Sequence, residues 1–251
     1  MSAALYMTKR GHRVTLVEKL GDLGGLFALA WRATGKKSMK EGLESLVRAV
    51  KEKVASVVLN RAVDAALVKE LGPDLLIWAT GPLQNIPDIP GLSNQHTITA
   101  LEFFTGKKEV RGPRVLLIGA GRTGIEIVEK LGEGEYEVVA TKRTDPIGGM
   151  MEMITRNLTL MRIGKMPKVT LMPHTAVRAF SSSMVEVEQD GKAMTLKPFQ
   201  TVVLASGTAP APGPDEEIRK SVSKTEIIGD AREVQDIFAA TQAGYQLAIR
   251  Y

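Results

Sequence analysis

The sequence predicts an α/β protein made of two related three-layer units, each a parallel sheet with helices on both faces. Strand-like apolar runs alternate along the chain with segments of helical periodicity, which is typical of this class. The segment VTLVEKLGDLGGL (residues 14–26) is matched by VVATKRTDPIGGM (residues 138–150), with aligned positions 124 residues apart. DLLIWATG (residues 74–81) is matched by QTVVLASG (residues 200–207) at an offset of 126. The repeated pattern indicates two copies of one unit.

The composition limits the class of protein. With 251 residues, 44% hydrophobic and 24% charged, the chain can form two domains with ordinary cores. It has no cysteine, which excludes disulfides, iron–sulfur ligands and dithiol chemistry within these residues, and we expect no metal site. The net charge of +5 comes without a basic cluster interleaved with aromatic residues, so we expect no nucleic-acid partner. The start MSAALYMTKRG does not resemble a secretion signal and no apolar run could cross a bilayer, so we expect a cytoplasmic protein with no membrane partner.

The segment RVLLIGAGRTGIEIVEKL (residues 114–131) is the clearest motif. An apolar strand, residues 114–118, leads into Gly119, Gly121 and Gly124, and the apolar residues that follow have helical spacing. In such a G-x-G-x-x-G turn the first glycine permits the turn, the second lets a pyrophosphate approach, and the third lets helix and strand pack closely. The helix N-terminus then faces the phosphates. The motif predicts a Rossmann-like dinucleotide-binding domain; a glycine turn without a ligand is the alternative.

The residues at the end of the next strand indicate which dinucleotide binds. An acid there accepts the ribose hydroxyls of NAD or FAD, whereas a base nearby accommodates the 2′-phosphate of NADP. Lys142 and Arg143 stand in this position, which favours NADPH over NADH, although exposed Lys-Arg pairs at strand ends are also common. Arg122 and Thr123, between the second and third glycines, complete the predicted site around this turn.

The first copy begins after the point at which its own glycine turn would stand. Carried back by 124 residues, Gly124 maps to position 0, immediately before the first residue. Residues 2–10 are therefore predicted to be the helix that follows a glycine turn, and residues 13–17 the next strand. Glu18, followed by Lys19, then stands in the acid position, which suits the ribose of FAD. We thus predict two Rossmann-like dinucleotide-binding domains, the first lacking its opening strand and glycine loop.

Other glycines belong to the predicted binding residues. Gly24 and Gly25 end the first copy of the repeated segment. Thr80-Gly81 and Gly207 end the two matched apolar strands, and such turns let the backbone pass close to a dinucleotide. An ordinary buried parallel strand that ends in glycine is the alternative for both.

Local signals predict several boundaries of helices and strands. Ser38 with Glu41, and Thr99 with Glu102, have the spacing of capping boxes at helix starts. Alternating apolar residues on either side of residues 190–191 (Asp-Gly) predict a tight antiparallel hairpin. A small antiparallel flap is therefore expected beside the second parallel sheet.

The segment KTEIIGDAREVQDIFAATQAGYQLAIR adds a strand, a Gly-Asp turn and a helix rich in small residues. With it, the chain resembles the flavoprotein reductases that bind two dinucleotides, whose NAD(P) domain is inserted into the FAD domain. The resemblance implies that Gly229 and Asp230 contact FAD. It also implies a truncated FAD-binding-type domain of residues 1–110 and 210–251, and an NAD(P)-binding domain of residues 111–209.

A finer resemblance is to the old-yellow-enzyme-related multidomain oxidoreductases, the group of 2,4-dienoyl-CoA reductase and trimethylamine dehydrogenase. TALEFFTGKKEVRGPRVLLIGAGRTGIE, MMEMITRN and IIGDAREVQDIFAATQAGYQLA are similar to the C-terminal half of those enzymes. There an FMN-binding TIM barrel with an iron–sulfur cluster comes first, which implies a barrel domain or subunit as partner; an oligomer is also open. The thioredoxin-reductase branch requires a C-x-x-C motif, which this chain does not contain.

The resemblance implies an oxidoreductase module that transfers hydride from NAD(P)H to FAD and on to a partner flavin. Glu126 either lies near the nicotinamide or is a solvated helix carboxylate. No residue is assigned a catalytic role, and His12, His96 and His174 are expected to be structural. The alternative is a non-catalytic nucleotide-binding module or a truncated fragment that no longer binds FAD, because three lost amide–phosphate hydrogen bonds cost about 5–9 kcal/mol.

Three explanations would account for the missing opening strand and loop of the first copy. They are a truncated or misassigned start, a split gene whose partner supplies the barrel and the loop, and a degenerate protein that stands alone. The substrate is not indicated, because the acceptor would be reduced in the barrel.

Overall fold

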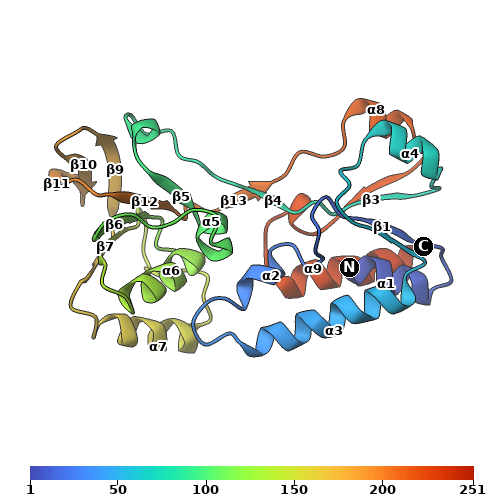
Figure 1. The fold of residues 1–251 in the computed structure, drawn as a ribbon, viewed down its shortest axis with the longest axis horizontal. Helices are drawn as coiled ribbons and strands as arrows, with labels where there is room; N and C mark the ends of the chain where they lie inside the picture. The colour runs from blue at the N-terminus through green and yellow to red at the C-terminus, as the bar shows by residue number, and fades with distance from the viewer. The chain divides into compact units, whose positions relative to one another are not determined.

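The computed structural model describes residues 1–251 and divides into two compact units (Figure 1). The first unit comprises Met1–Trp31, Lys36–Leu83 and Thr208–Tyr251, and the second comprises Arg32–Gly35 and Gln84–Gly207. The main body of the second unit is therefore inserted between two parts of the first. None of the helices combines the length and the apolar composition that a bilayer span requires.

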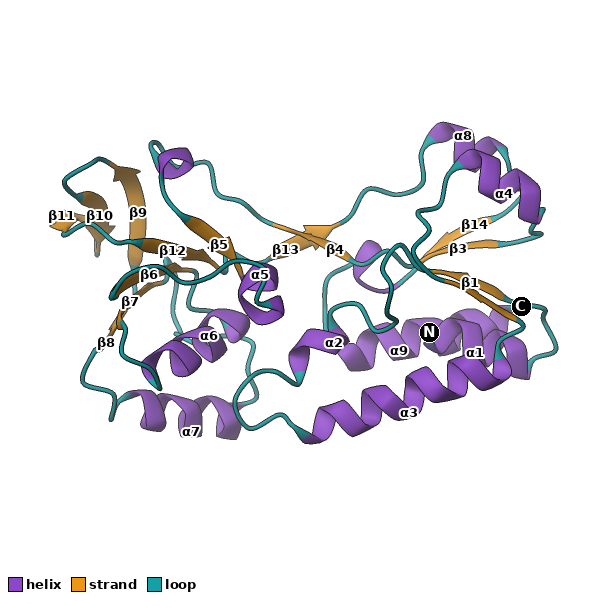
Figure 2. Ribbon diagram, in the orientation of Figure 1, coloured by secondary structure: helices purple, strands orange, loops and turns teal.

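The second unit is built on a five-stranded parallel sheet (Figure 2). Its strand order is β5-β12-β6-β7-β8, and each neighbouring pair runs parallel. The strands are β5 (Thr97–Thr99), β6 (Arg114–Ile118), β7 (Glu137–Thr141), β8 (Val169–Met172) and β12 (Thr201–Leu204). The helices are η1 (Leu92–Asn94), α5 (Ala100–Thr105), α6 (Arg122–Gly132) and α7 (Met153–Ile163). Most residues of β6, β7 and β12 are buried, as expected for central strands of a parallel sheet.

A three-stranded antiparallel sheet of order β11-β10-β9 accompanies the parallel sheet. It consists of β9 (Thr175–Phe180), β10 (Val185–Gln189) and β11 (Lys192–Leu196). Asp190 and Gly191 connect β10 to β11 with φ values of 50° and 76°, the left-handed region that tight hairpin turns require. The buried Val185 and Val187 join the same core cluster as Leu116 of β6. The predicted hairpin and flap are confirmed.

The strands of the first unit form separate two-stranded sheets. β1 (Thr15–Val17) pairs in parallel with β2 (Ser56–Val58), β3 (Leu76–Trp78) pairs in parallel with β14 (Thr225–Ile227), and β4 (Pro82–Gln84) pairs with β13 (Thr208–Pro210). No ladder joins β1 to β3. The helices are α1 (Ser2–Lys9), α2 (Phe27–Ala30), α3 (Ser38–Lys53), α4 (Ala65–Leu71), α8 (Glu216–Lys220), η2 (Gly229–Ala231) and α9 (Ile237–Arg250).

Helix α1 contributes to two separate hydrophobic clusters in the first unit. Ala4 belongs to the cluster that contains Val14, next to β1, and residues of α3. Ala3 belongs to the cluster that contains Leu247 of α9 and a residue of β3. A Cβ on Gly244 would lie 2.6 Å from the backbone nitrogen of Ala3, so glycine allows α9 to approach α1 closely. The predicted N-terminal helix and its packing beside β1 are confirmed.

The boundary between the two units differs from the sequence prediction. Residues 84–110, which the sequence assigns to the first domain, lie in the second unit. Ile98 of β5 is fully buried there, and the backbone N–H of Val202 in β12 donates to the carbonyl of His96 at 2.9 Å. The segment supplies the edge strand of the second sheet, so the chain passes between the units near Leu83 rather than near residue 110.

One predicted capping box is confirmed and the other is wrong. The Thr99 hydroxyl accepts from the backbone N–H of Glu102 at 3.2 Å, and the Glu102 carboxylate accepts from the N–H of Thr99 at 2.9 Å. Helix α3, in contrast, begins at Ser38 itself and has no side-chain cap. The residue before it, Lys37, already has right-handed helical angles, whereas a capping residue is usually extended.

Candidate functional site

The glycine turn between β6 and α6 has the strand–turn–helix form that the sequence predicts. The backbone N–H groups of Gly119 and Ala120 each donate at 3.0 Å to the carbonyl of Thr141, the last residue of neighbouring β7. Gly121 is the N-cap of α6, and its carbonyl accepts from the N–H of Ile125 at 3.0 Å. The turn therefore lies at the carboxyl ends of β6 and β7, the edge at which open parallel sheets bind ligands.

The three glycines of this turn meet three different surroundings. A Cβ on Gly119 would lie 2.4 Å from the carbonyl oxygen of Ala205, and one on Gly124 would lie 2.1 Å from that of Gly119. No atom lies within 4 Å of the Cβ position on Gly121. The first and third glycines are therefore required by the packing of the chain itself. The second faces open space, which fits the approach of a pyrophosphate to the backbone.

The N-terminal amides of α6 have no capping side chain. Five other helices, α4, α5, α7, α8 and α9, are capped by the side chains of Asp64, Thr99, Glu152, Asp215 and Asp236. Helix α6 instead begins at Gly121, which has no side chain to offer. Uncapped amides at the positive end of the helix dipole favour an anion, so this end of α6 suits a phosphate.

The two residues after Gly121 have different surroundings. The guanidinium of Arg122 donates to the carbonyl of Met150, from Nε at 3.0 Å and from Nη2 at 2.5 Å. The N–H of Gly148 donates to the carbonyl of Ala120 at 2.9 Å, so the Gly-Gly turn after β7 is tied to the glycine turn. Thr123 is exposed. Arg122 thus holds two loops together, while Thr123 faces solvent.

Lys142 and Arg143 directly follow β7, next to the glycine turn. The backbone N–H of Lys142 donates to the carbonyl of Met172 at 3.0 Å, which keeps this residue in register with β8. Its Nζ donates to the Thr144 hydroxyl at 2.9 Å. Arg143 is exposed and forms no hydrogen bond or ion pair. Its guanidinium can therefore receive an anionic group without breaking an existing contact.

Strands β3 and β12 are each followed by a glycine with a positive φ angle. Gly81, after β3, has a φ of 80°, and Gly207, after β12, has a φ of 86°. The Gly207 carbonyl accepts from the N–H of Asn85 and from Nε2 of Gln84, each at 3.0 Å. Thr80 is exposed beside Gly81. Positive φ angles favour glycine at both turns, because a Cβ there is strained.

The predicted FAD-side residues follow β1 in the first unit. The Glu18 carboxylate accepts a hydrogen bond from the backbone N–H of Leu20 at 2.9 Å, and Lys19 is exposed. Gly24 and Gly25 have φ values of 131° and 52°. Glu18 therefore lies at the carboxyl end of a parallel strand with one carboxylate oxygen already bonded to its own turn.

The Gly-Asp turn follows β14 and leads towards α9. Gly229 has a φ of 60° and begins η2. The Asp230 carboxylate accepts from the backbone N–H of Gln235 at 3.1 Å. Asp236 then caps α9 by accepting from the N–H of Ala239 at 2.8 Å. Gly229 and Asp230 thus lie at the carboxyl end of β14, next to β3.

Two acids on α6 are buried. Glu126 is only 9% exposed, so the interpretation of it as a solvated carboxylate is wrong. Glu129 is 2% exposed and accepts from Nε of Arg162 on α7, an ion pair that the sequence analysis did not predict. The contact with Glu129 raises the pKa of Arg162. The available signal was spacing, because Glu129 lies four residues after the buried Ile125 and so shares its helix face.

The three histidines contact backbone carbonyls or a carboxylate, which is consistent with structural roles. His12 contacts the Tyr251 carbonyl, His96 the Glu109 carbonyl, and His174 the carboxylate of Asp145 at 3.0 Å.

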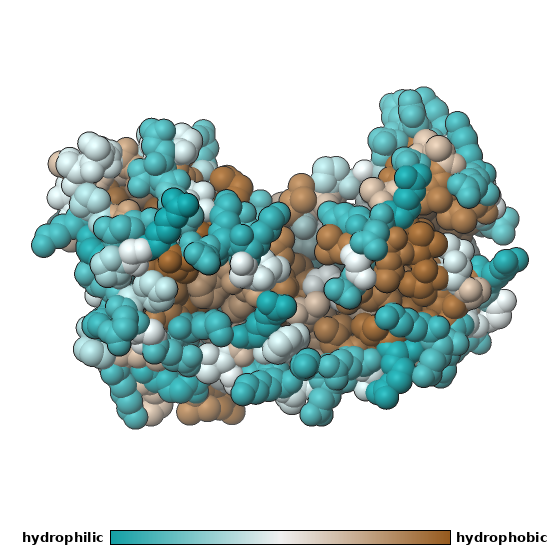
Figure 3. All heavy atoms as spheres, viewed as in Figure 1, coloured by the Kyte–Doolittle hydropathy of each residue, from teal (hydrophilic) through white to brown (hydrophobic).

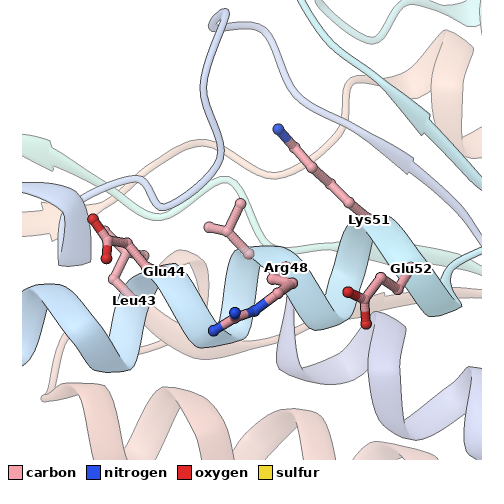
Figure 4. Close-up of a pocket in the computed structure, with 6 residues that line it drawn as sticks. Leu43, Glu44, Arg48, Lys51 and Glu52 are labelled. Atoms are coloured by element: carbon pink, nitrogen blue, oxygen red, sulfur yellow. The ribbon is translucent and has the colours of Figure 1, made fainter.

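A surface pocket of about 440 Å³ lies along α3 (Figure 4). It contains none of the predicted binding residues; its lining consists of Leu43, Glu44, Val47, Arg48, Lys51 and Glu52. Every lining residue comes from α3, so the pocket is an open groove along one helix rather than a site at the end of a sheet.

Comparisons with known proteins agree with this geometry. The family model described as "Pyridine nucleotide-disulphide oxidoreductase" matches residues 1–241. The chain is 30% identical over 249 residues to the bilirubin reductase of Mediterraneibacter gnavus (strain CC55_001C), covering 99% of this chain and 38% of the relative. It is 28% identical over 255 residues to the NADH oxidase of Thermoanaerobacter brockii, covering 99% and 39%.

A solved structure of 2-naphthoyl-CoA reductase in complex with 2-naphthoyl-CoA has the same fold. It superposes with a TM-score of 0.91 at 23% identity, over 100% of this chain and 38% of that one. This chain therefore spans about two fifths of the length of the proteins that it matches. The resemblance to flavoproteins with two Rossmann-like dinucleotide-binding domains is confirmed. The chain belongs to the pyridine nucleotide-disulphide oxidoreductase family, whose cofactors are NAD(P)H and FAD.

Proposed function

We propose that this chain is the NAD(P)H- and FAD-binding module of a larger flavin oxidoreductase, and that it transfers hydride from NAD(P)H to FAD and on to a partner flavin or iron–sulfur domain. The observation that carries the proposal is the open space in front of Gly121 at the uncapped N-terminus of α6. The family supports the cofactors, and the partial coverage of its relatives supports a further domain. The chain has no cysteine, so no dithiol of its own takes part.

In this proposal the second unit holds NAD(P)H. The amides at Gly121 and at the start of α6 bind the pyrophosphate, because they are uncapped and lie at the positive helix end. Arg143, with Lys142, receives the 2′-phosphate, which makes NADPH the preferred donor. Arg122 acts indirectly, because its guanidinium is bonded to the loop that carries Met150. The residues of this chain bind, orient and shield the reactants, and NAD(P)H and FAD supply the hydride chemistry when bound.

The first unit contributes residues that bind FAD. Glu18 accepts the ribose hydroxyls of the adenosine, and Gly229 with Asp230 contacts the ribityl–phosphate region. The turns at Thr80-Gly81 and, in the second unit, at Gly207 leave the backbone open where each dinucleotide passes.

A single substitution tests the NAD(P)H site. A Cβ at Gly121 meets no atom within 4 Å, so Gly121→Val is expected to fold normally while its side chain occupies the phosphate space. We expect its affinity for NADPH to fall by about tenfold or more in a fluorescence titration. Gly42→Val is the matched control: it lies on α3 of the first unit, is not one of the predicted NAD(P)H-binding residues, and is expected to leave the affinity unchanged. Equal NADPH affinity of the wild type and Gly121→Val would contradict the proposal.

The second candidate is a nucleotide-binding module without turnover, and the separated sheets of the first unit favour it. Diaphorase activity distinguishes the two. The full chain is supplied with NADPH, added FAD and an artificial electron acceptor. Acceptor reduction that depends on both nucleotides supports the oxidoreductase. Binding of NADPH without any acceptor reduction at saturating FAD supports the module without turnover.

A further inference from the structure

One acid lies in the loop that carries the predicted 2′-phosphate residues. Asp145 is two residues after Arg143, in the segment between β7 and α7. Two residues of chain span at most about 7 Å, so a free Asp145 carboxylate could reach the Arg143 guanidinium. Such an ion pair would occupy the group that the proposed function assigns to the 2′-phosphate, and the carboxylate would also repel that phosphate.

The structure shows a different partner for this acid. Oδ2 of Asp145 lies 3.0 Å from Nε2 of His174, which is on the turn between β8 and β9. Because an ionised carboxylate only accepts hydrogen bonds, Nε2 is the donor. Arg143 forms no hydrogen bond or ion pair. The acid nearest to Arg143 in the sequence is thus bonded to a residue of another turn, and the guanidinium is left free.

The turn that carries His174 is fixed by hydrogen bonds to two neighbouring segments. The N–H of Thr175 donates to the carbonyl of Lys142 at 2.8 Å, which ties the turn to the end of β7. The N–H of Asp190, in the hairpin between β10 and β11, donates to the carbonyl of His174 at 3.1 Å. His174 itself has a φ of 49°, in the left-handed region. The backbone of the sheet and the flap therefore holds the imidazole beside the loop after β7.

The contact between His174 and Asp145 is open to solvent. Their side chains are 47% and 56% exposed, and pairs as exposed as this add little to the stability of a fold. In Figure 3, teal and white residues cover most of the end of the second unit where β9, β10 and β11 lie in Figure 1. A carboxylate released from His174 would therefore stay in water, free to turn towards Arg143.

From these observations we infer that His174 is a positioning residue that sets the preference for NADPH over NADH. By holding the Asp145 carboxylate, it prevents an ion pair between Asp145 and Arg143 and leaves the guanidinium for the 2′-phosphate. The inference rests on the proposed function, in which Arg143 binds that phosphate, and extends it to a residue on a different turn. NADH has no 2′-phosphate, so its binding does not depend on His174.

A purely structural role for this contact predicts a different pattern of effects. If His174 only fastened the loop after β7, loss of either partner would loosen the loop and weaken the binding of both nucleotides. In the inferred role only the loss of His174 weakens NADPH binding, because loss of the Asp145 charge removes the competitor for Arg143 as well. Variants at the two positions, alone and together, therefore distinguish the two roles.

Three variants of the full chain test the inference in fluorescence titrations with NADPH and with NADH. His174→Asn suits the positive φ, because asparagine tolerates the left-handed region, but its side chain is too short to place a donor at the Nε2 position. We expect it to weaken NADPH binding about threefold to fivefold, the scale of an exposed ion pair, and to leave NADH binding unchanged. Asp145→Asn, and the double variant with His174→Asn, are expected to bind NADPH at least as tightly as the wild type.

Arg178→Gln is the matched control, because Arg178 forms an exposed ion pair with Glu188 at 3.0 Å in the same unit. The substitution leaves a carboxylate without its partner outside the loop after β7, and it is expected to change neither affinity. The inference is overturned if His174→Asn binds NADPH as tightly as the wild type, if it loses affinity for both nucleotides equally, or if Asp145→Asn does not restore NADPH binding in the double variant.

Arg143→Ala separates this inference from the proposed function. If Arg143→Ala weakens NADPH binding selectively and His174→Asn does not, the inference alone fails. If Arg143→Ala leaves NADPH binding unchanged, the assignment of the 2′-phosphate fails and the inference fails with it. If His174→Asn does not fold, His174→Gly, which also tolerates a positive φ, is measured in its place under the same criteria.

Discussion

A Cβ on Gly124 would lie 2.1 Å from the carbonyl oxygen of Gly119, although the two glycines are five positions apart in the sequence. This contact brings the first turn of α6 against the end of β6. Gly121, between them, has open space at its own Cβ position. Neighbouring positions of one motif therefore serve different purposes, close packing at Gly124 and access for a ligand at Gly121.

This difference predicts that alanine at Gly124 mainly lowers stability, whereas alanine at Gly121 mainly weakens nucleotide binding. Gly124→Ala forces a methyl group against backbone atoms, and we expect it to lower the free energy of unfolding by about 1–3 kcal/mol. Gly121→Ala meets no atom within 4 Å, so we expect it to lower that free energy by less than Gly124→Ala does, at most about 1 kcal/mol for the poorer N-cap, and to weaken NADPH binding. Urea unfolding and a nucleotide titration measure the two effects. Equal destabilisation by both substitutions is the contrary result.

Arg143 is predicted to distinguish NADPH from NADH. Because its guanidinium has no partner in the chain, Arg143→Ala removes no internal contact. We expect it to weaken NADPH binding by about 1.5–3 kcal/mol, the range for a charged hydrogen bond, and to leave NADH binding nearly unchanged. Lys130→Ala on α6 is the control for the loss of one positive charge. Parallel losses for both nucleotides would show that Arg143 does not contact the 2′-phosphate.

The Glu129–Arg162 pair is predicted to stabilise the packing of α6 against α7. Arg162→Ala leaves a nearly buried carboxylate without its partner, and we expect it to cost about 1–3 kcal/mol of unfolding free energy. Replacing both residues by leucine is expected to cost less than Arg162→Ala alone, because no buried charge then remains. Chemical denaturation of the single and double variants gives the comparison. A double variant less stable than Arg162→Ala contradicts this role for the pair.

The capping box of α5 is predicted to make stability depend on pH. Burial raises the pKa of Glu102, but hydrogen bonds from Thr99 and Lys108 outweigh it and bring this pKa below its ordinary value. A pKa lower in the folded than in the unfolded chain stabilises the fold above the unfolded value of about 4.3, and the contribution is lost as pH falls through the folded value.

Glu102→Gln is therefore expected to destabilise the protein at neutral pH and to differ little from the wild type at acid pH. The difference near neutral pH is expected to be about 1 kcal/mol, the usual contribution of a cap. Unfolding free energies measured from pH 7 downwards check it. A difference that stays constant over this range would show that the carboxylate charge plays no part.

The parts of the fold that depend on neighbouring residues could be predicted from the sequence. The turn at Gly119–Gly124 follows from glycine spacing, the hairpin from the Asp190-Gly191 turn, and the start of α5 from the spacing of Thr99 and Glu102. In each case the residues that determine the geometry lie within a few positions of one another. The predicted cap at Ser38 was wrong, because the preceding backbone is already helical there.

By itself, the sequence determined the repeated unit, the glycine turn and the charged residues after β7. Only the tertiary structure decided that residues 84–110 belong to the second sheet, that Glu126 and Glu129 are buried, and that β1 and β3 do not pair. The physical reason is the distance along the chain between the residues that interact. Strand partners and burial depend on residues far away along the chain, which local patterns do not specify.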